Sequence, residues 1–129
     1  MIDILLVDDY AAVREGLRMR LSLEPDLRIV GEAKDGLNAI LLARNLNPSL
    51  IIMDVEMPKL DGISATAQMK SEAVDSEIII LSMDDSTKTH EKATAAGAAA
   101  VLPKNDPVDK LISTIRSVIL SRSPAMAIA

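Results

Sequence analysis

The chain has no cysteine and almost no aromatic residues. Tyr10 is its only aromatic side chain, since tryptophan and phenylalanine are absent. Without cysteine, disulfides and thiolate metal sites are excluded, and the chain suits a reducing compartment. The core must therefore be almost wholly aliphatic, with seven methionines able to fill irregular spaces.

Long apolar runs and basic stretches are also missing. No apolar run approaches the roughly 18 residues of a membrane span, and Asp3, close to Met1, is unlike the basic start of a signal peptide. The 19 acidic residues outnumber the 14 basic ones, and no lysine or arginine run could neutralise a row of phosphates. We therefore expect a cytoplasmic protein that binds neither a membrane nor nucleic acid directly.

What is present is an alternation of short apolar runs with segments of helical period. With 129 residues, 49% of them hydrophobic, the chain suits one domain with one core. The apolar runs predict strands at about residues 2–7, 28–33, 50–54, 77–81 and 99–102. This alternation favours an α/β fold, a doubly wound five-stranded parallel sheet with helices on both faces, in the flavodoxin-like order 2-1-3-4-5.

The helical segments differ in how clearly their buried face can be predicted. The second helix is expected to turn four apolar residues inward, namely Leu37, Ile40, Leu41 and Leu46. The arginines of the first helix, Arg14, Arg18 and Arg20, are expected on its solvated side. A broad apolar stripe marks the last helix, and residues 121–129 have no periodic pattern. We therefore predict one domain over residues 1–120, followed by a tail or the start of a linker over residues 121–129.

Five polar residues stand at the ends of the predicted strands. Asp8 and Asp9 follow the first apolar run, Asp54 the third and Ser82 the fourth, while Lys104 follows the fifth. The carboxyl ends of parallel strands share one edge of the sheet, where ligand crevices open at the topological switch point. The sequence thus predicts a site rather than a scattered set of surface charges.

The residue types at this edge suit phosphoryl chemistry. Three clustered carboxylates repel one another unless a cation lies among them, and Mg²⁺ fits a site with few protein ligands plus water. The Lys104 ammonium and the Ser82 hydroxyl can each meet a phosphoryl oxygen. Asp54, the single acid on the central strand, is our candidate nucleophile, because a carboxylate can form an acyl phosphate.

These residues and their neighbours closely resemble bacterial response regulator receiver domains, most of all those of LuxR/FixJ-type regulators. The likeness covers about residues 2–120. The motifs that carry it are Leu6-Val7-Asp8-Asp9, Met53-Asp54-Val55-Glu56-Met57-Pro58 with Asp61-Gly62, Leu81-Ser82, and Gly97-Ala98 ahead of Leu102-Pro103-Lys104.

The resemblance implies a signalling switch of two-component transcription regulation. Asp54 would accept a phosphoryl group from a sensor histidine kinase, and Mg²⁺ would be ligated by Asp9, Asp54 and the backbone carbonyl of Glu56, with Asp8 acting through water. Ser82 and Lys104 would hold the phosphoryl oxygens and relay the change to the face formed by the fourth helix, fifth strand and fifth helix. Such a protein catalyses only its own phosphotransfer and dephosphorylation. It can form a homodimer on phosphorylation, and it reaches DNA only through an output domain.

Three features depart from the family pattern. Receivers commonly place an aromatic residue three positions before the active-site lysine, where this chain has Val101, so the aromatic half of the usual switch is in doubt. Many receivers carry proline directly after the lysine, but Asn105 stands there and Pro103 precedes it. No helix-turn-helix follows the last helix, which indicates either a stand-alone receiver or a truncated regulator.

Two acidic residues flank the expected phosphoryl position. Glu56 and Asp84 each lie two residues beyond a site residue. In receivers such positions tune how fast water removes the phosphoryl group. We hypothesise that their negative charge disfavours a hydroxide-like nucleophile.

Other functions compete with the switch. One is a receiver-like scaffold that works without phosphorylation, which Val101 and the alanine-rich fourth helix leave open. Another is an aspartyl phosphatase, although such enzymes pair their acids as Asp-x-Asp, whereas Asp8 and Asp9 are adjacent. A flavin carrier is the weakest option, because the turn after the first strand lacks glycines or hydroxyls to cradle a phosphate.

Overall fold

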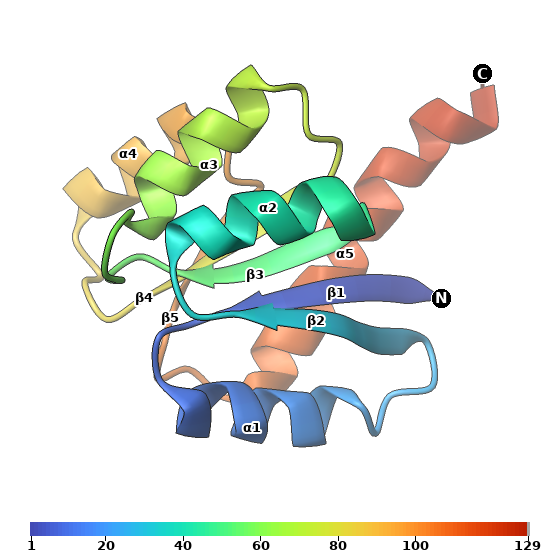
Figure 1. The fold of residues 1–129 in the computed structure, drawn as a ribbon. Coiled ribbons are helices and arrows are strands. Elements are labelled where there is room, and N and C mark those ends of the chain that lie inside the picture. The colour runs from blue at the N-terminus through green and yellow to red at the C-terminus, as the bar shows by residue number, and fades with distance from the viewer. Residues whose placement is uncertain (129) are drawn as a thin grey trace.

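The computed structural model describes the backbone of residues 1–128 and the side chains of residues 1–122. Strands and helices alternate along the chain (Figure 1). Their bounds are β1 Ile2–Val7, α1 Ala11–Leu21, β2 Leu27–Ala33, α2 Gly36–Leu46, β3 Leu50–Asp54, α3 Gly62–Ser71, β4 Glu77–Ser82, α4 Thr87–Ala96, β5 Ala100–Pro103 and α5 Val108–Ile128. Among the described residues, none of the helices combines the length and apolarity needed to cross a bilayer.

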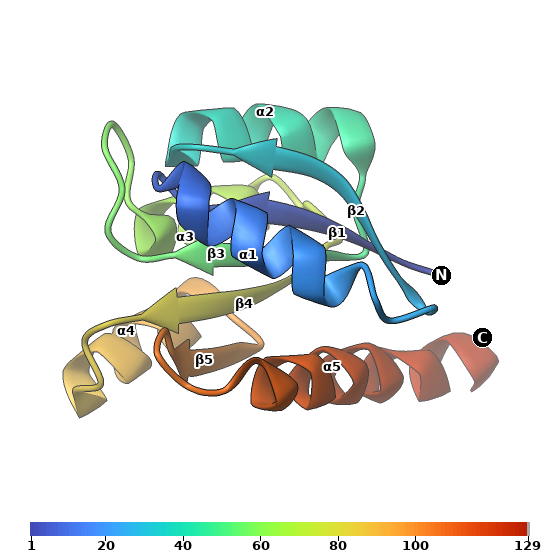
Figure 2. The same cartoon turned by 90° about the horizontal axis from the view of Figure 1, so that it is seen from below.

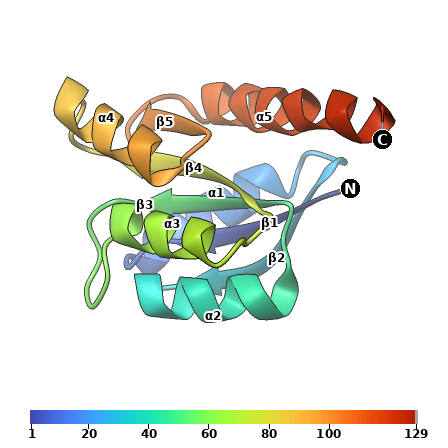
Figure 3. The same cartoon turned by 90° about the horizontal axis from the view of Figure 1, so that it is seen from above.

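The strands form one parallel sheet in the order β2-β1-β3-β4-β5, which confirms the predicted topology. Helices cover both faces. Seen from below, α1 and α5 lie in front of the sheet (Figure 2), and from above α2 and α3 do (Figure 3). Because every strand runs the same way, all five carboxyl ends open on one edge of the sheet. The predicted site lies on that edge.

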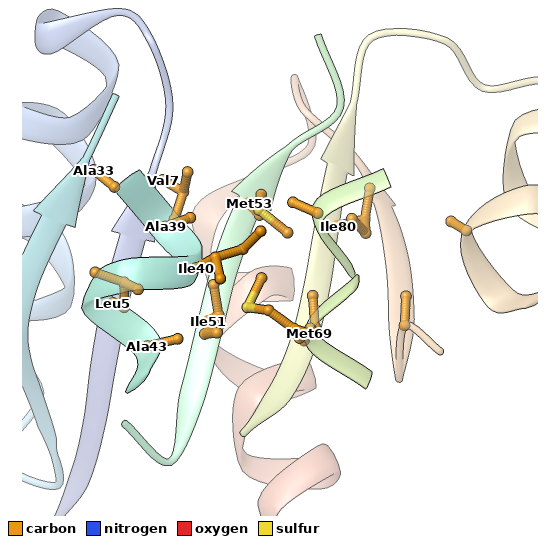
Figure 4. Packing of buried hydrophobic residues seen from close by; sticks show 14 residues of the cluster. Leu5, Val7, Ala33, Ala39, Ile40, Ala43, Ile51, Met53, Met69 and Ile80 are labelled. Carbon is orange, nitrogen blue, oxygen red and sulfur yellow. The ribbon is translucent and has the colours of Figure 1, made fainter. Parts of the chain in front are cut away.

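Two aliphatic layers hold the helices to the sheet. Alternate residues of the buried strands point to opposite faces, so Leu5, Ile51 and Ile80 pack under α2 and α3 (Figure 4), while Ile4, Ile52 and Ile79 pack against α1 and α5. The side chains of β3 from Leu50 to Met53 are at most 1% exposed. This burial on both faces explains why the strands read as continuous apolar runs.

The α2 helix buries a different face from the one predicted. Three leucines predicted to point inward are 39–53% exposed: Leu37, Leu41 and Leu46. Ile40 is buried as predicted, and Ala39 and Ala43 accompany it (Figure 4). Small residues let the helix lie close to the sheet, and the leucines on its flanks are left partly in water. Close packing against the sheet therefore determines which face of α2 is buried, and this face is not the one with the largest apolar residues.

The last helix continues beyond residue 120, where its apolar period ends. Its backbone is helical to Ile128, in a stretch that the sequence pattern assigned to a tail or linker, and residue 129 lies outside the described residues. Apolar periodicity reports which face is buried and not where a helix ends, so the pattern could not show this extension. The division into a domain over residues 1–120 and a following segment stays a prediction.

The loop between β3 and α3 depends on a close approach at Gly62. Its N–H donates to the Val55 carbonyl at 2.8 Å. A Cβ atom added at Gly62 would lie 2.0 Å from the backbone oxygen of Asp54. Since the obstacle is backbone, no side-chain rotation relieves the clash. Any larger residue must displace the backbone at the end of β3, where Asp54 lies, or the loop that follows it.

We expect Gly62→Ala to lower the free energy of unfolding by about 2 kcal/mol or more. Gly16, exposed in the middle of α1, is the matched control, because an added Cβ meets no atom within 4 Å there. Gly16→Ala should raise stability by about 0.5–1 kcal/mol through better helix propensity. Urea denaturation of both variants measures this, and the same sign in both would contradict the argument.

Candidate functional site

The sheet brings the five predicted polar residues to its carboxyl edge. Asp8 and Asp9 directly follow β1, Asp54 and Ser82 end β3 and β4, and Lys104 directly follows β5. Pairing of Val7 with Met53, Asp54 with Leu81 and Ser82 with Pro103 places these strand ends side by side. Carboxylate oxygens of Asp8, Asp9 and Asp54 lie within 4.8 Å of one another.

The Lys104 ammonium joins two of the three carboxylates. Its Nζ lies 2.8 Å from Oδ2 of Asp8 and 3.0 Å from Oδ2 of Asp54. All three side chains are largely buried, with 13% of Lys104, 5% of Asp8 and 6% of Asp54 exposed. The ring of Tyr10 lies beside the same ammonium, 5.6 Å from its centroid to Nζ. The lysine thus points into the acidic cluster.

Burial and charge act on the protonation of this cluster in opposite directions. Burial raises the pKa of Asp54, and repulsion from Asp8 and Asp9 adds to this, while the bond to Lys104 acts against it. For Lys104, burial alone would lower the pKa, but its hydrogen bonds to Asp8 and Asp54 outweigh burial and raise the pKa. The lysine therefore stays charged, and the pKa of Asp54 stays raised despite its contact with that ammonium.

One carboxylate oxygen of the cluster lacks a hydrogen bond. Oδ1 of Asp9 is buried and has no hydrogen-bond partner among the described residues. A buried, unpaired carboxylate oxygen is costly unless a cation meets it. Together with the neighbouring oxygens of Asp8 and Asp54, it offers the hard oxygen donors that Mg²⁺ prefers. The donor set therefore fits the predicted ion.

A cavity of about 350 Å³ opens beside the cluster. Its walls are Asp9, Tyr10, Asp54, Glu56, Met57, Met83 and Lys104. The space is wide enough for a phosphoryl group and its solvating water, and charged groups of both signs reach it. The lining includes Glu56, whose predicted role through its backbone carbonyl remains a prediction.

Ser82 lies at the edge of the cluster, but its hydroxyl is occupied locally. Its Oγ donates to the carbonyl of Asp84 and accepts from the N–H of Asp84, both at 3.0 Å. The Asp84 carboxylate in turn accepts from the N–H of Ser86 and the hydroxyl of Thr89, at the start of α4. These bonds lower the pKa of Asp84, with Thr89 as the main cause. The serine is thereby connected to α4.

Several residues at the site were missed or misplaced by the sequence pattern. The sequence predicts that the methionines fill the core, which is wrong for Met83, because it is 69% exposed and lines the cavity. The pattern also predicts Arg14 on the solvated side of α1, yet its side chain is only 18% exposed and donates to the Asp8 carbonyl. Neither position carries a sequence signal, since periodicity does not report where a flexible side chain ends.

Comparison with known proteins places this site in a family. The family model described as the response regulator receiver domain matches residues 4–116. The transcriptional regulatory protein DegU of Brevibacillus brevis is 36% identical over 91% of this chain and 50% of its own length. A protein-glutamate methylesterase/protein-glutamine glutaminase of Anaeromyxobacter dehalogenans is 40% identical over 98% of this chain and 41% of its own. The chain therefore spans about half or less of these two relatives.

A solved receiver domain has the same fold as this chain. The signal receiver domain of the response regulator NarL from Mycobacterium tuberculosis superposes with a TM-score of 0.88 at 27% identity, covering 92% of this chain and 95% of that one. The residues that the family model matches, 4–116, include all five strand ends and the acidic cluster of Asp8, Asp9 and Asp54. The chain belongs to the response regulator receiver domain family.

Proposed function

We propose that this chain is a cytoplasmic, phosphorylation-dependent signalling switch. Asp54 accepts a phosphoryl group from the phosphohistidine of a sensor kinase, with Mg²⁺ bound by Asp9, Asp54 and the Glu56 carbonyl and with Asp8 acting through water. The observation that carries the proposal is the ammonium of Lys104 at hydrogen-bond distance from Asp8 and Asp54, in a cluster where one Asp9 oxygen has no hydrogen-bond partner among the residues that the structure describes. An output domain or partner receives the signal, and we expect it to regulate transcription, because relatives such as DegU and LiaR are named transcriptional regulatory proteins.

The proposed transfer requires little chemistry from the protein beyond positioning. An oxygen of Asp54 attacks phosphorus, the P–N bond to the kinase imidazole breaks, and its electron pair returns to the imidazole nitrogen. Bound Mg²⁺ supplies charge neutralisation. Lys104, now bonded to Asp54, exchanges that contact for a phosphoryl oxygen. Tyr10, Met57 and Met83 border the cavity and limit the water that reaches the acyl phosphate.

We propose that the signal leaves the site through Ser82 and not through an aromatic ring. To donate to a phosphoryl oxygen, Ser82 must give up its bond to the Asp84 carbonyl. Asp84 holds Ser86 and Thr89 at the start of α4, so this exchange changes the contacts that fix α4. Val101 on β5 has no ring to follow the hydroxyl. The output face would then be that of α4, β5 and α5.

Incubation of the whole chain with Mg²⁺ and acetyl phosphate tests the proposal. We expect the intact mass to gain one phosphoryl group in the wild type, and no gain in Asp54→Asn or in the wild type with excess chelator. An unmodified mass in the wild type would overturn the switch and favour the phosphorylation-independent scaffold. Steady turnover of a phosphate monoester would favour the aspartyl phosphatase.

A charge at Glu56 is predicted to lengthen the life of the acyl phosphate. Glu56 lines the cavity, and about 1 kcal/mol of repulsion toward a hydroxide-like nucleophile corresponds to about a fivefold slower reaction. Glu56→Ala should therefore lose its phosphoryl group about fivefold faster, and the isosteric Glu56→Gln should match it. The measurement is the decay of phosphorylated protein after removal of the donor. An unchanged decay rate in Glu56→Gln would remove charge as the cause.

A further inference from the structure

Arg14 connects α1 to the backbone of the acidic loop. Its Nη1 donates to the carbonyl oxygen of Asp8 at 2.5 Å, and its Nε donates to Oε1 of Glu32 at 3.1 Å. Glu32 belongs to β2, the strand beside β1. The guanidinium therefore connects the edge strand β2 to the loop between β1 and α1, and hydrogen bonds at both Nε and Nη1 fix its orientation.

The remaining polar groups of Asp8 are fixed as well. Its N–H donates to the Ala33 carbonyl at 3.1 Å, and its Oδ1 accepts from the Tyr10 N–H at 2.9 Å. Its Oδ2 is left for Lys104. With the carbonyl held by Arg14, the plane of the peptide between Asp8 and Asp9 is set. That plane fixes the backbone from which the Asp9 side chain extends, and Oδ1 of this side chain is the oxygen without a hydrogen-bond partner in the described part of the chain.

We propose that Arg14 is a positioning residue for the Mg²⁺ site, acting through the Asp8 carbonyl. This inference rests on the proposed function. Arg14 does not contact the three carboxylates that would receive the ion. It holds the peptide that joins Asp8 and Asp9, so that the carboxylates of these two residues are already oriented before the ion binds. Groups that orient metal ligands in this way usually change metal affinity about tenfold or more when they are removed.

Arg18 provides a matched control for the charge of Arg14. It lies one turn further along α1 and pairs with the other oxygen of Glu32 at 2.7 Å, but it makes no bond to Asp8. Replacing either arginine by glutamine removes one positive charge near an acidic site. Charge alone therefore predicts equal or tighter Mg²⁺ binding in both variants, whereas loss of positioning predicts weaker binding in Arg14→Gln only.

The experiment is a titration of the whole chain with Mg²⁺ alone, in which binding is measured by calorimetry and by the fluorescence of Tyr10. We expect the Kd to rise about tenfold in Arg14→Gln and to stay within about twofold of wild type in Arg18→Gln. Arg14→Lys keeps the charge but loses the planar fork whose Nε and Nη1 donate to two separate acceptors, so its Kd should also rise. Equal affinities in the Arg14 and Arg18 variants, or tighter binding in Arg14→Gln, would overturn the proposal.

A second readout works without metal. In ¹H–¹⁵N spectra of the metal-free chain, Arg14→Gln should shift the amide signals of Asp9 and Tyr10, and Arg18→Gln should leave them in place. If the wild type fails to bind Mg²⁺, the proposed function fails at that step, while these shifts still report whether Arg14 sets the loop. Unmoved Asp9 and Tyr10 signals in Arg14→Gln would refute the positioning role itself.

Discussion

In Mg²⁺-free buffer at neutral pH, Lys104→Met is expected to lower the free energy of unfolding by about 3 kcal/mol. The ammonium is the positive partner that the structure gives to both Asp8 and Asp54, at 2.8 and 3.0 Å, and both carboxylates are almost fully buried. Methionine preserves the apolar stem but leaves two buried charges facing each other. Removing one partner of a buried ion pair is costly for this reason.

The stability of Lys104→Met should also depend on pH differently from that of the wild type. The pKa of Asp54 is raised in the folded protein by burial, so ionised Asp54 costs folding free energy above that pKa, and the cost vanishes as pH falls through it. Without Lys104, the contacts that oppose this rise are lost and the pKa rises further. Lys104→Met should therefore regain more stability than the wild type as the pH falls from neutrality toward the ordinary pKa of a carboxyl group.

Other carboxylates limit this gain at lower pH. Hydrogen bonds from Arg116 lower the pKa of both Glu24 and Asp26. Their contribution to stability is present above the unfolded pKa and is lost as pH falls through the lowered folded pKa. Stability of the metal-free protein should therefore pass through a maximum on the acid side of neutrality, above about pH 4.

Urea denaturation of the metal-free protein across this pH range checks both expectations. Lys92→Met is the control, because Lys92 is an exposed lysine on α4, away from the acidic cluster. Its effect should stay within about 0.5 kcal/mol. Added Mg²⁺ should restore much of the stability of Lys104→Met, since the ion supplies the missing positive charge. Equal losses in the two lysine variants would contradict a special role for Lys104.

Strand positions could be predicted because strands buried on both faces have continuous runs of apolar residues in the sequence. The bounds of β1 and β3 agree with the predicted ranges, and β4 differs only by including Ser82 at its end. The buried face of α2 could not be predicted. Its sequence offers more apolar residues than the sheet can cover, and close packing selected Ala39 and Ala43 over three leucines.

The composition of the site could be predicted, but not the directions of its side chains. Strand topology alone brings Asp8, Asp9, Asp54 and Lys104 to one edge. The local bonds of the Ser82 hydroxyl to Asp84 depend on a turn geometry that the sequence does not state. Likewise, Arg14 reaches backwards from α1 because its long side chain can meet Asp8 and Glu32 together, a fit that exists only in three dimensions.

Asp9→Asn is expected to change stability in opposite directions without and with Mg²⁺. In metal-free buffer, the substitution removes the negative charge of one of three crowded carboxylates, which has a buried oxygen without a hydrogen-bond partner among the described residues, and should raise stability by about 1 kcal/mol. Wild-type protein at a Mg²⁺ concentration of one hundred times its Kd should gain about 2.7 kcal/mol. With affinity about a hundredfold weaker, Asp9→Asn should gain only about 0.4 kcal/mol.

The order of stability of the two proteins should therefore reverse. Asp9→Asn is the more stable without Mg²⁺, and the wild type by about 1.3 kcal/mol with it, measured by urea denaturation. Asp3→Asn removes the same charge at the opposite end of β1, where Asp3 pairs with Arg28, and should keep the full response to Mg²⁺. A lower stability of Asp9→Asn in both conditions would mean that this carboxylate supports the fold by itself. A reversal would mean that the crowding of the three acids is tolerated by the fold because a cation relieves it.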